Sequence, residues 1–95
     1  MINGNITDFI DQLNYGQELL FSYNGRNYFI QGWWDKDKNE AVMVLTDESD
    51  QTFNGYLWKS RRSKMSECAE EFLKASLWDG LDFLQIEKNV IWTEW

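Results

Sequence analysis

The chain has 95 residues and a formal net charge of −7, from 9 basic and 16 acidic side chains, and 17% of its residues are aromatic. This length fits one domain over residues 1–95, and so many aromatic side chains exclude a disordered acidic tail. The absence of histidine and the single cysteine, Cys68, exclude imidazole zinc sites, Ser-His and Cys-His nucleophile pairs and internal disulfides. We expect Cys68 to be a small buried side chain.

A helix is expected first, over residues 6–15. Apolar side chains recur at helical spacing from Ile6 to Leu13, Asn5 suits the N-cap, and Gly16 suits the end of the helix. The residues before this helix lack the basic and apolar regions of a signal sequence. The longest wholly apolar run, residues 41–45, is far shorter than the ~20 residues of a membrane helix. We therefore expect a cytoplasmic protein that does not span a membrane.

A hairpin is the next element, with strands over residues 18–23 and 26–31. Between them, Asn24-Gly25 supplies the two positive φ angles of a type I′ turn, which places Tyr23 opposite Arg26. With that register, the core face of the hairpin consists of Leu19, Phe21, Tyr23, Tyr28 and Ile30. The other face consists of Leu20, Ser22, Asn27, Phe29 and Gln31.

The middle of the chain predicts two further strands. Gly32 is expected to mark a bulge, because glycine within a strand pattern often does so. A polar turn over residues 35–40 precedes a short apolar strand over 41–46. A second turn over 47–51 precedes a strand over 52–59. Together with the hairpin, these segments predict an antiparallel meander of four strands.

Helical spacing returns at Met65, with Ser63 as the expected N-cap and an end near Leu77. Residues 81–86 fit either a short helix or a strand, and residues 89–95 alternate well enough for a fifth strand. The resulting expectation is an α+β fold. It has an antiparallel meander sheet of four to five strands, with an N-terminal helix and one or two C-terminal helices packed on it.

Several of these segments resemble short uncharacterised proteins of Gram-positive bacteria, which combine a helix, an Asn-Gly hairpin, further strands and a C-terminal helix. The matching residues are Asp8-Phe9-Ile10 with Leu13, Gly16-Gln17-Glu18, the run from Phe21 to Tyr28, Glu71-Phe72-Leu73, Asp79-Gly80, Phe83 and Ile86. The resemblance implies a helix over residues 81–86. It implies no activity, because that family has no established function.

Tryptophan and arginine supply the candidate binding residues. Neighbouring residues of a strand point to opposite faces, so Trp33 and Trp34 cannot both face one core, and at least one of them is expected to be exposed. Tryptophan and arginine are enriched at binding hot spots. The hypothesis is a binding surface formed by Trp33, Trp34, Trp58, Arg61 and Arg62.

The basic segment 59–64 holds four of the nine cations and admits two interpretations. It could bind nucleic acid together with nearby aromatic rings, or it could be a solvated connector that balances the acidic turns. The overall charge of −7 disfavours nucleic acid, because phosphate neutralisation drives that binding.

Other chemistry finds little support in the sequence. The carboxylates of residues 47–51 lack the frame of a calcium loop, and the glycines do not have the spacing of a phosphate-binding loop. We therefore expect no catalytic residue, metal or cofactor. The favoured function is a non-enzymatic module that binds a protein partner or a copy of itself. The alternative is an acidic immunity-type or anti-defence inhibitor that occupies the basic site of a nuclease.

Overall fold

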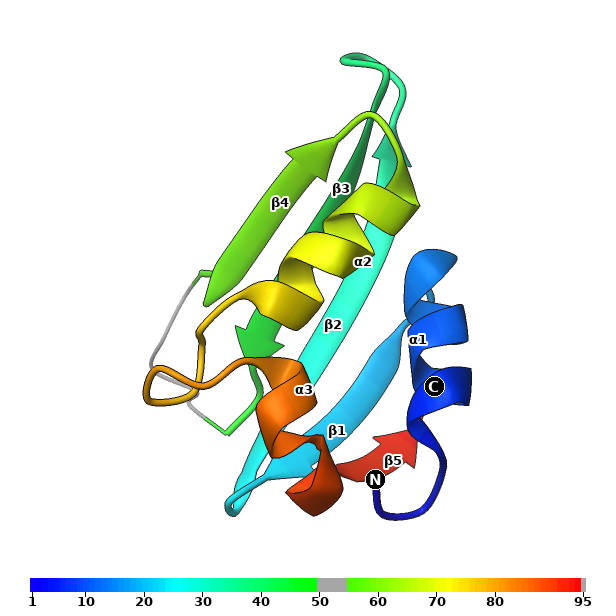
Figure 1. Ribbon diagram of the computed structural model, residues 1–95. Coiled ribbons are helices and arrows are strands. Elements are labelled where there is room, and N and C mark those ends of the chain that lie inside the picture. The colour runs from blue at the N-terminus through cyan, green and yellow to red at the C-terminus, as the bar shows by residue number, and fades with distance from the viewer. Residues whose placement is uncertain (50–54, 95) are drawn as a thin grey trace.

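A computed structural model describes residues 1–49 and 55–94 of the chain. Its elements, in chain order, are α1 (Ile6–Asn14), β1 (Leu19–Tyr23), β2 (Arg26–Asp35), β3 (Glu40–Asp47), β4 (Trp58–Arg62), α2 (Met65–Lys74), α3 (Phe83–Ile86), a 3₁₀ turn (Glu87–Asn89) and β5 (Ile91–Glu94). The strands form one antiparallel sheet in the order β4-β3-β2-β1-β5. Figure 1 shows α1, α2 and α3 together on one face of this sheet. The α+β class and the antiparallel sheet are thus confirmed.

The β1–β2 hairpin has the predicted register, with Tyr23 opposite Arg26 and Leu19 opposite Ile30. Asn24 has φ 54° and Gly25 has φ 83°, so both turn residues adopt the left-handed conformation that a type I′ turn requires. Local turn chemistry therefore determines the register of the hairpin and which of its residues share a face.

Aromatic rings from four elements meet between the helices and the sheet. The ring of Phe9 on α1 stacks on Phe83 of α3 at 5.0 Å and meets Trp92 of β5 edge-on at 5.3 Å. Phe21 of β1 meets both Phe9 and Phe83 edge-on, at 5.9 and 5.5 Å. Such aromatic pairs each contribute about 0.5–1.5 kcal/mol beyond the burial of their area. This cluster ties both ends of the chain to the hairpin.

The bulge predicted at Gly32 is wrong, because β2 and β3 pair without interruption from Tyr28–Asp47 to Asp35–Glu40. A close approach of Gly32 to Gly16 and Met65 accounts for the glycine at this position instead. Its N–H donates to the Gly16 carbonyl oxygen at 3.1 Å, and a Cβ at Gly32 would lie 2.6 Å from the Met65 sulfur. A break in register occurs instead between β1 and β5, at Leu20/Phe21.

The strand predicted over residues 52–59 differs from β4, which extends from Trp58 to Arg62; residues 52–54 of that prediction lie outside the described part of the chain. The basic segment is thus largely an edge strand rather than a connector. Ser60 faces the interior and is 3% exposed, while its neighbours Lys59 and Arg61 point the other way. Charged side chains on an edge strand also oppose pairing with further chains.

The start and end of α2 differ from the prediction. Lys64, not Ser63, is the N-cap residue; the Ser63 hydroxyl donates instead to Glu67 Oε1 at 2.6 Å. The helix ends at Lys74 rather than near Leu77, because Ala75 is extended and the chain turns to bring Trp78 into the core, where it is 7% exposed.

The elements α3 and β5 test the predictions for residues 81–86 and 89–95. Residues 83–86 form α3, which begins with a capping box between Asp82 and Gln85, so the helix implied by the resemblance is present over most of residues 81–86. The predicted fifth strand is present as β5. Residue 95, at the end of that prediction, lies outside the described residues.

Two further findings concern burial. Cys68 is fully buried, as expected, and its thiol lies 3.6 Å from the Ala41 carbonyl oxygen; burial raises the pKa of this thiol above its usual value. In the described ranges, no helix has the length and apolar character needed to cross a membrane.

Candidate functional site

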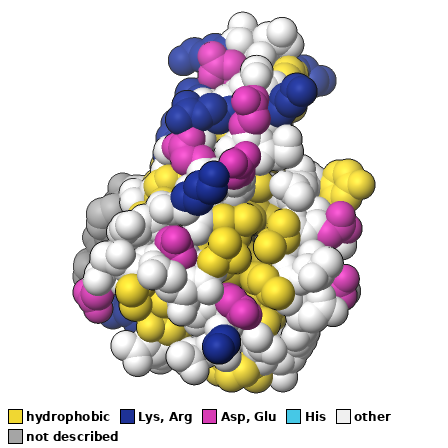
Figure 2. Space-filling model, viewed as in Figure 1, with side chains coloured by type: hydrophobic (Ala, Val, Ile, Leu, Met, Phe, Trp, Pro, Cys, Tyr) yellow, Lys and Arg dark blue, Asp and Glu magenta, His cyan; other side chains and the backbone are white. Residues whose placement is uncertain are grey.

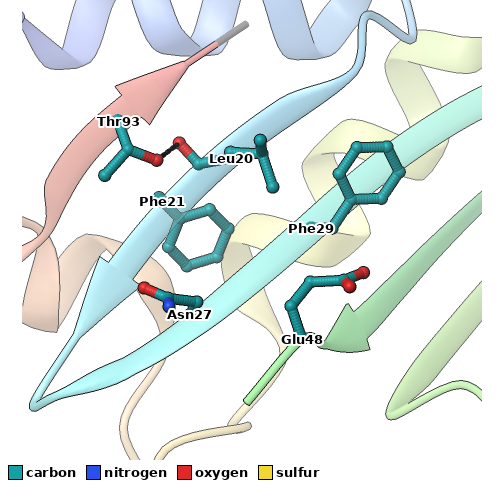
Figure 3. A pocket seen from close by; sticks show the side chains of 6 residues that line it. All are labelled: Leu20, Phe21, Asn27, Phe29, Glu48 and Thr93. Atoms are coloured by element: carbon teal, nitrogen blue, oxygen red, sulfur yellow. Dashed lines mark hydrogen bonds between the residues drawn. The ribbon is translucent and has the colours of Figure 1, made fainter. Parts of the chain in front are cut away.

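The sheet has one face without helices. The helix face carries Phe21 and Ile30, which are buried in the core. Strand residues alternate between the faces, so the opposite face, which we call the helix-free face, carries Leu20, Ser22, Asn27, Phe29, Gln31, Trp33, Asp35, Glu40, Val42, Val44, Thr46, Lys59 and Arg61. No helix of residues 1–49 or 55–94 packs on it, and part of it is seen in Figure 3.

Trp33 and Trp34 lie on opposite faces of β2. Trp33 is on the helix-free face and is 39% exposed, whereas Trp34 is on the helix face and is 47% exposed. Both tryptophans therefore retain accessible surface, in agreement with the expectation that at least one is exposed. The two side chains cannot contact one partner through a single flat surface.

The other predicted residues divide in the same way. Trp58 is half-buried on the helix face, where its ring lies 5.5 Å from the Phe72 ring of α2. Arg62 forms an ion pair with Glu71 of α2. Arg61 alone shares the helix-free face with Trp33. The structure thus brings Trp33 and Arg61 together and places the remaining three on the helix side.

Arg61 and Trp33 flank β3 in one row across the sheet, because Val42 pairs with Arg61 on one side and with Trp33 on the other. The Arg61 guanidinium reaches across β3, and its Nη1 lies 3.0 Å from Asp35 Oδ2 at the end of β2. This hydrogen bond holds the pKa of the Asp35 carboxyl below its usual value.

The centre of this face is shielded from solvent by its own side chains. Val42 and Val44 are fully buried although they point away from the helices and lie outside the main core cluster. In the ladder, Gln31 and Lys59 flank Val44. Neighbouring long side chains therefore cover the valines, and Trp33 is the large apolar group of β2 that remains exposed on this face.

Carboxylates offset much of the charge of the basic segment. Arg61 contacts Asp35 and Arg62 contacts Glu71, while Lys59 Nζ lies 5.8 Å from the centre of the Tyr56 ring. Figure 2, seen from the helical side, shows Lys and Arg intermixed with Asp and Glu over the upper part of the molecule. Paired charges of this kind attract phosphates less than isolated cations do.

A shallow apolar groove lies on the helix-free face where β1, β2 and β5 meet, away from β4. Its volume is about 630 Å³, and it is lined by Leu20, Phe21, Asn27, Phe29, Glu48 and Thr93. Figure 3 shows these side chains around the junction of β1, β2 and β5. At the register break, the Thr93 hydroxyl donates to the Leu20 carbonyl oxygen at 2.9 Å, and Thr46 donates to Glu48 Oε1 at 2.9 Å.

The sequence analysis did not identify this groove. Strand alternation placed Leu20 and Phe29 together on the second face of the hairpin, but it gave no sign that the face would lack a helix. Thr93 joins them only because β5 returns from the C-terminal end to pair with β1. Such long-range pairing has no local signal in the sequence.

Within the described ranges, no group of three or more Cys, Asp or Glu side chains is arranged to hold a metal ion. The accessible groups on the helix-free face are the Trp33 indole, a few apolar side chains, the Arg61–Asp35 ion pair, the charged side chains of Lys59 and Glu40, and hydroxyl or amide groups. This combination is typical of protein-binding surfaces.

No protein-family model matches the chain, and the searches of curated proteins and of solved structures also found no match. The resemblance to the Gram-positive proteins therefore stays a prediction.

Proposed function

We propose that this protein is a non-enzymatic protein-binding module whose contact surface is the helix-free face of its sheet. The observation that carries the proposal is the 39% exposure of Trp33 on a face without a helix. Trp33 pairs with Val42 of β3, and an indole has only two side-chain dihedral angles, so it loses little conformational entropy when a partner covers it.

The surroundings of Trp33 support the same function. Arg61 is held across β3 by Asp35 at 3.0 Å, so the polar groups beside the indole are ordered before a partner arrives. The apolar groove at Leu20 and Phe29 extends the surface along the sheet. An apolar centre bordered by satisfied polar groups is the usual arrangement of a protein interface.

The two adjacent tryptophans provide a matched pair of variants. Trp33→Ala removes the indole from the helix-free face, and Trp34→Ala removes one of similar exposure from the other face. Tagged wild-type protein and each variant would be used for affinity capture from extract of the native cell. We expect wild type and Trp34→Ala to retain a partner that Trp33→Ala loses. Loss of a hot spot weakens the binding free energy by about 2 kcal/mol or more.

Two outcomes would contradict the proposal. A partner lost with Trp34→Ala and kept with Trp33→Ala would place the contact on the helix face. If Trp33→Ala binds the partner as tightly as wild type does, and if the affinity of that complex falls steeply from low to high salt, the acidic inhibitor of a nuclease is favoured instead.

A further inference from the structure

We propose that the groove where β1, β2 and β5 meet binds an extended segment of a partner protein, in which a large apolar side chain and a Lys or Arg lie two residues apart. This inference rests on the proposed function, because it specifies the chemistry of a partner that docks on the helix-free face. Three features support it: the apolar row of the groove, the carboxylate at its border, and its small size.

Leu20 and Phe29 form the apolar part of the groove. They lie directly opposite each other in the β1–β2 ladder, and both line the groove. Their side chains are only half-buried, because α1, α2 and α3 pack on the other face of the sheet. A large apolar side chain of a partner would remove both from water, which is the kind of contact that hot spots supply.

An irregularity in the sheet keeps the groove open on the β5 side (Figure 3). Leu20 pairs with Glu94 and Phe21 with Trp92, so Thr93 is the additional residue of a β-bulge. Its hydroxyl donates to the Leu20 carbonyl oxygen at 2.9 Å. The side chain that borders the groove here is therefore short, and an apolar group can enter without depriving that hydroxyl of its hydrogen bond.

Glu48 places a carboxylate at the border of the groove. Its backbone N–H donates to the Asn27 carbonyl oxygen at 2.8 Å, and its exposed side chain accepts a hydrogen bond from the Thr46 hydroxyl at 2.9 Å. In the described part of the chain, no Lys or Arg forms an ion pair with Glu48. The chain also has a net charge of −7, so both the local and the overall charge favour a cation on the partner.

The positions of these side chains define the spacing in the partner. Asn27 and Phe29 are two residues apart on one face of β2, so their rows are about 7 Å apart along the strands. Glu48 lies in the row of Asn27. In an extended segment that runs along the strands, side chains on one face also recur about every 7 Å. An apolar side chain over Leu20 and Phe29 therefore places the side chain two residues away beside Glu48.

The size of the groove favours a short segment over a folded domain. Six residues line it, whereas a standard interface buries about 800 Å² per partner and involves roughly 20–30 residues on each side. A small-molecule site, by contrast, encloses most of its ligand, and this groove is shallow. One apolar anchor and one exposed ion pair give a weak complex, as is typical of transient contacts.

Selection of displayed peptides tests the proposed chemistry. A phage library of random short peptides would be selected against the immobilised full chain. We expect wild type to enrich Trp, Phe, Leu or Met two residues from a Lys or Arg. Glu48→Lys should reverse the preference at the charged position to Asp or Glu and keep the apolar position. Glu40→Lys, which makes the same change of charge at the opposite end of β3, is the control and should keep the wild-type preference.

A nuclear magnetic resonance titration with the most enriched peptide, made synthetically, locates the site. The largest shifts should occur at the backbone amides of Leu20, Phe29 and Thr93. Asn27→Trp extends a bulky side chain over the groove from an exposed position and should weaken binding by about ten-fold or more, because the apolar anchor is excluded. Far-UV circular dichroism would show that the variants keep the fold.

Four outcomes would overturn the inference. They are the absence of any enriched peptide, enrichment without a cation at that spacing, a preference that Glu48→Lys leaves unchanged, and shifts confined to another surface. None of these overturns the proposed function, because Trp33 lies four residues from Phe29 along β2, about 13 Å away, and affinity capture with Trp33→Ala tests it separately. Conversely, a peptide bound in the groove would support this inference even if Trp33→Ala kept every captured partner.

Discussion

Trp33 and Trp34 are neighbours in the sequence, yet they belong to different surfaces of the protein. Strand geometry alone predicts this separation, because successive side chains of a strand point to opposite faces. Which of the two lies on the helix-free face depends on where α1, α2 and α3 pack on the sheet. The same reasoning separates Arg61, which lies beside Trp33 across β3, from Arg62, which contacts Glu71 on α2.

The Arg61–Asp35 pair gives a prediction about pH. Asp35 accepts hydrogen bonds from Arg61 and from the backbone N–H groups of Asp37 and Lys38, and the Arg61 contact is the main cause of its lowered pKa. A pKa that is lowered by folding stabilises the protein above the ordinary Asp value of 3.8, and this contribution is lost as the pH falls through the lower folded pKa.

We therefore expect Arg61→Met to reduce the free energy of unfolding at neutral pH. The difference from wild type should close as the pH falls below the ordinary Asp value. Urea denaturation across this range measures the effect, and nuclear magnetic resonance titration of the Asp35 carboxyl should show its pKa rising in the variant. Lys36→Met, which removes a nearby charge without touching the pair, is the control. A difference that persists unchanged at low pH would show that Arg61 acts through packing alone.

At the scale of elements, three segments meet at a pair of glycines. Gly16 follows α1 with φ +72°, and Gly32 lies in β2 with its N–H bonded to the Gly16 oxygen. Met65, the first residue of α2, fills the space that a side chain at either glycine would occupy. The absence of two Cβ atoms therefore lets α1, β2 and α2 approach one another.

Gly32→Ala should lower the free energy of unfolding by about 1 kcal/mol, the low end of the usual cost of overpacking, because its Cβ would lie 2.6 Å from the sulfur of the flexible Met65 side chain and 3.1 Å from the Gly16 Cα atom. Urea denaturation measures this cost. In a Met65→Ala background, the sulfur is gone and the cost of Gly32→Ala should fall by at least half. Additive costs in the double variant would show that Met65 is not the group that excludes the methyl.

At the scale of the whole molecule, one aromatic cluster joins both ends of the chain to the central hairpin. Phe9 near the N-terminus contacts Trp92 near the C-terminus, and Phe21 contacts Trp78. Ile2 also pairs with Ile91 beside β5. Such shared contacts favour cooperative unfolding, in which all helices and strands unfold together rather than one by one.

We accordingly predict one cooperative unfolding transition for residues 1–95. Far-UV circular dichroism reports the helices and strands, and tryptophan fluorescence reports the core around Trp78 and Trp92, so the two urea curves should coincide within error. The measurements belong at low protein concentration, where self-association does not contribute to stability. Two separate transitions would mean that the chain contains more than one cooperative unit.

Sequence alone determined the features that depend on near neighbours in the chain. Asn24-Gly25 determined the hairpin and its register, the apolar spacing around Phe9 determined α1, and alternation determined that Trp33 and Trp34 would separate. These features could be predicted because turn residues, helical period and strand alternation act over a few residues. Sequence also excluded histidine chemistry and internal disulfides outright.

Only the tertiary structure decided which surface is available for binding. The return of β5 to β1, the meeting of Gly32 with Gly16 and Met65, and the ion pair between Asp35 and Arg61 all join residues far apart in the sequence. Their energies come from long-range packing, which local patterns do not encode. The helices α1, α2 and α3 cover the same face of the sheet, and for that reason the other face, with Trp33 and the groove, is the candidate site.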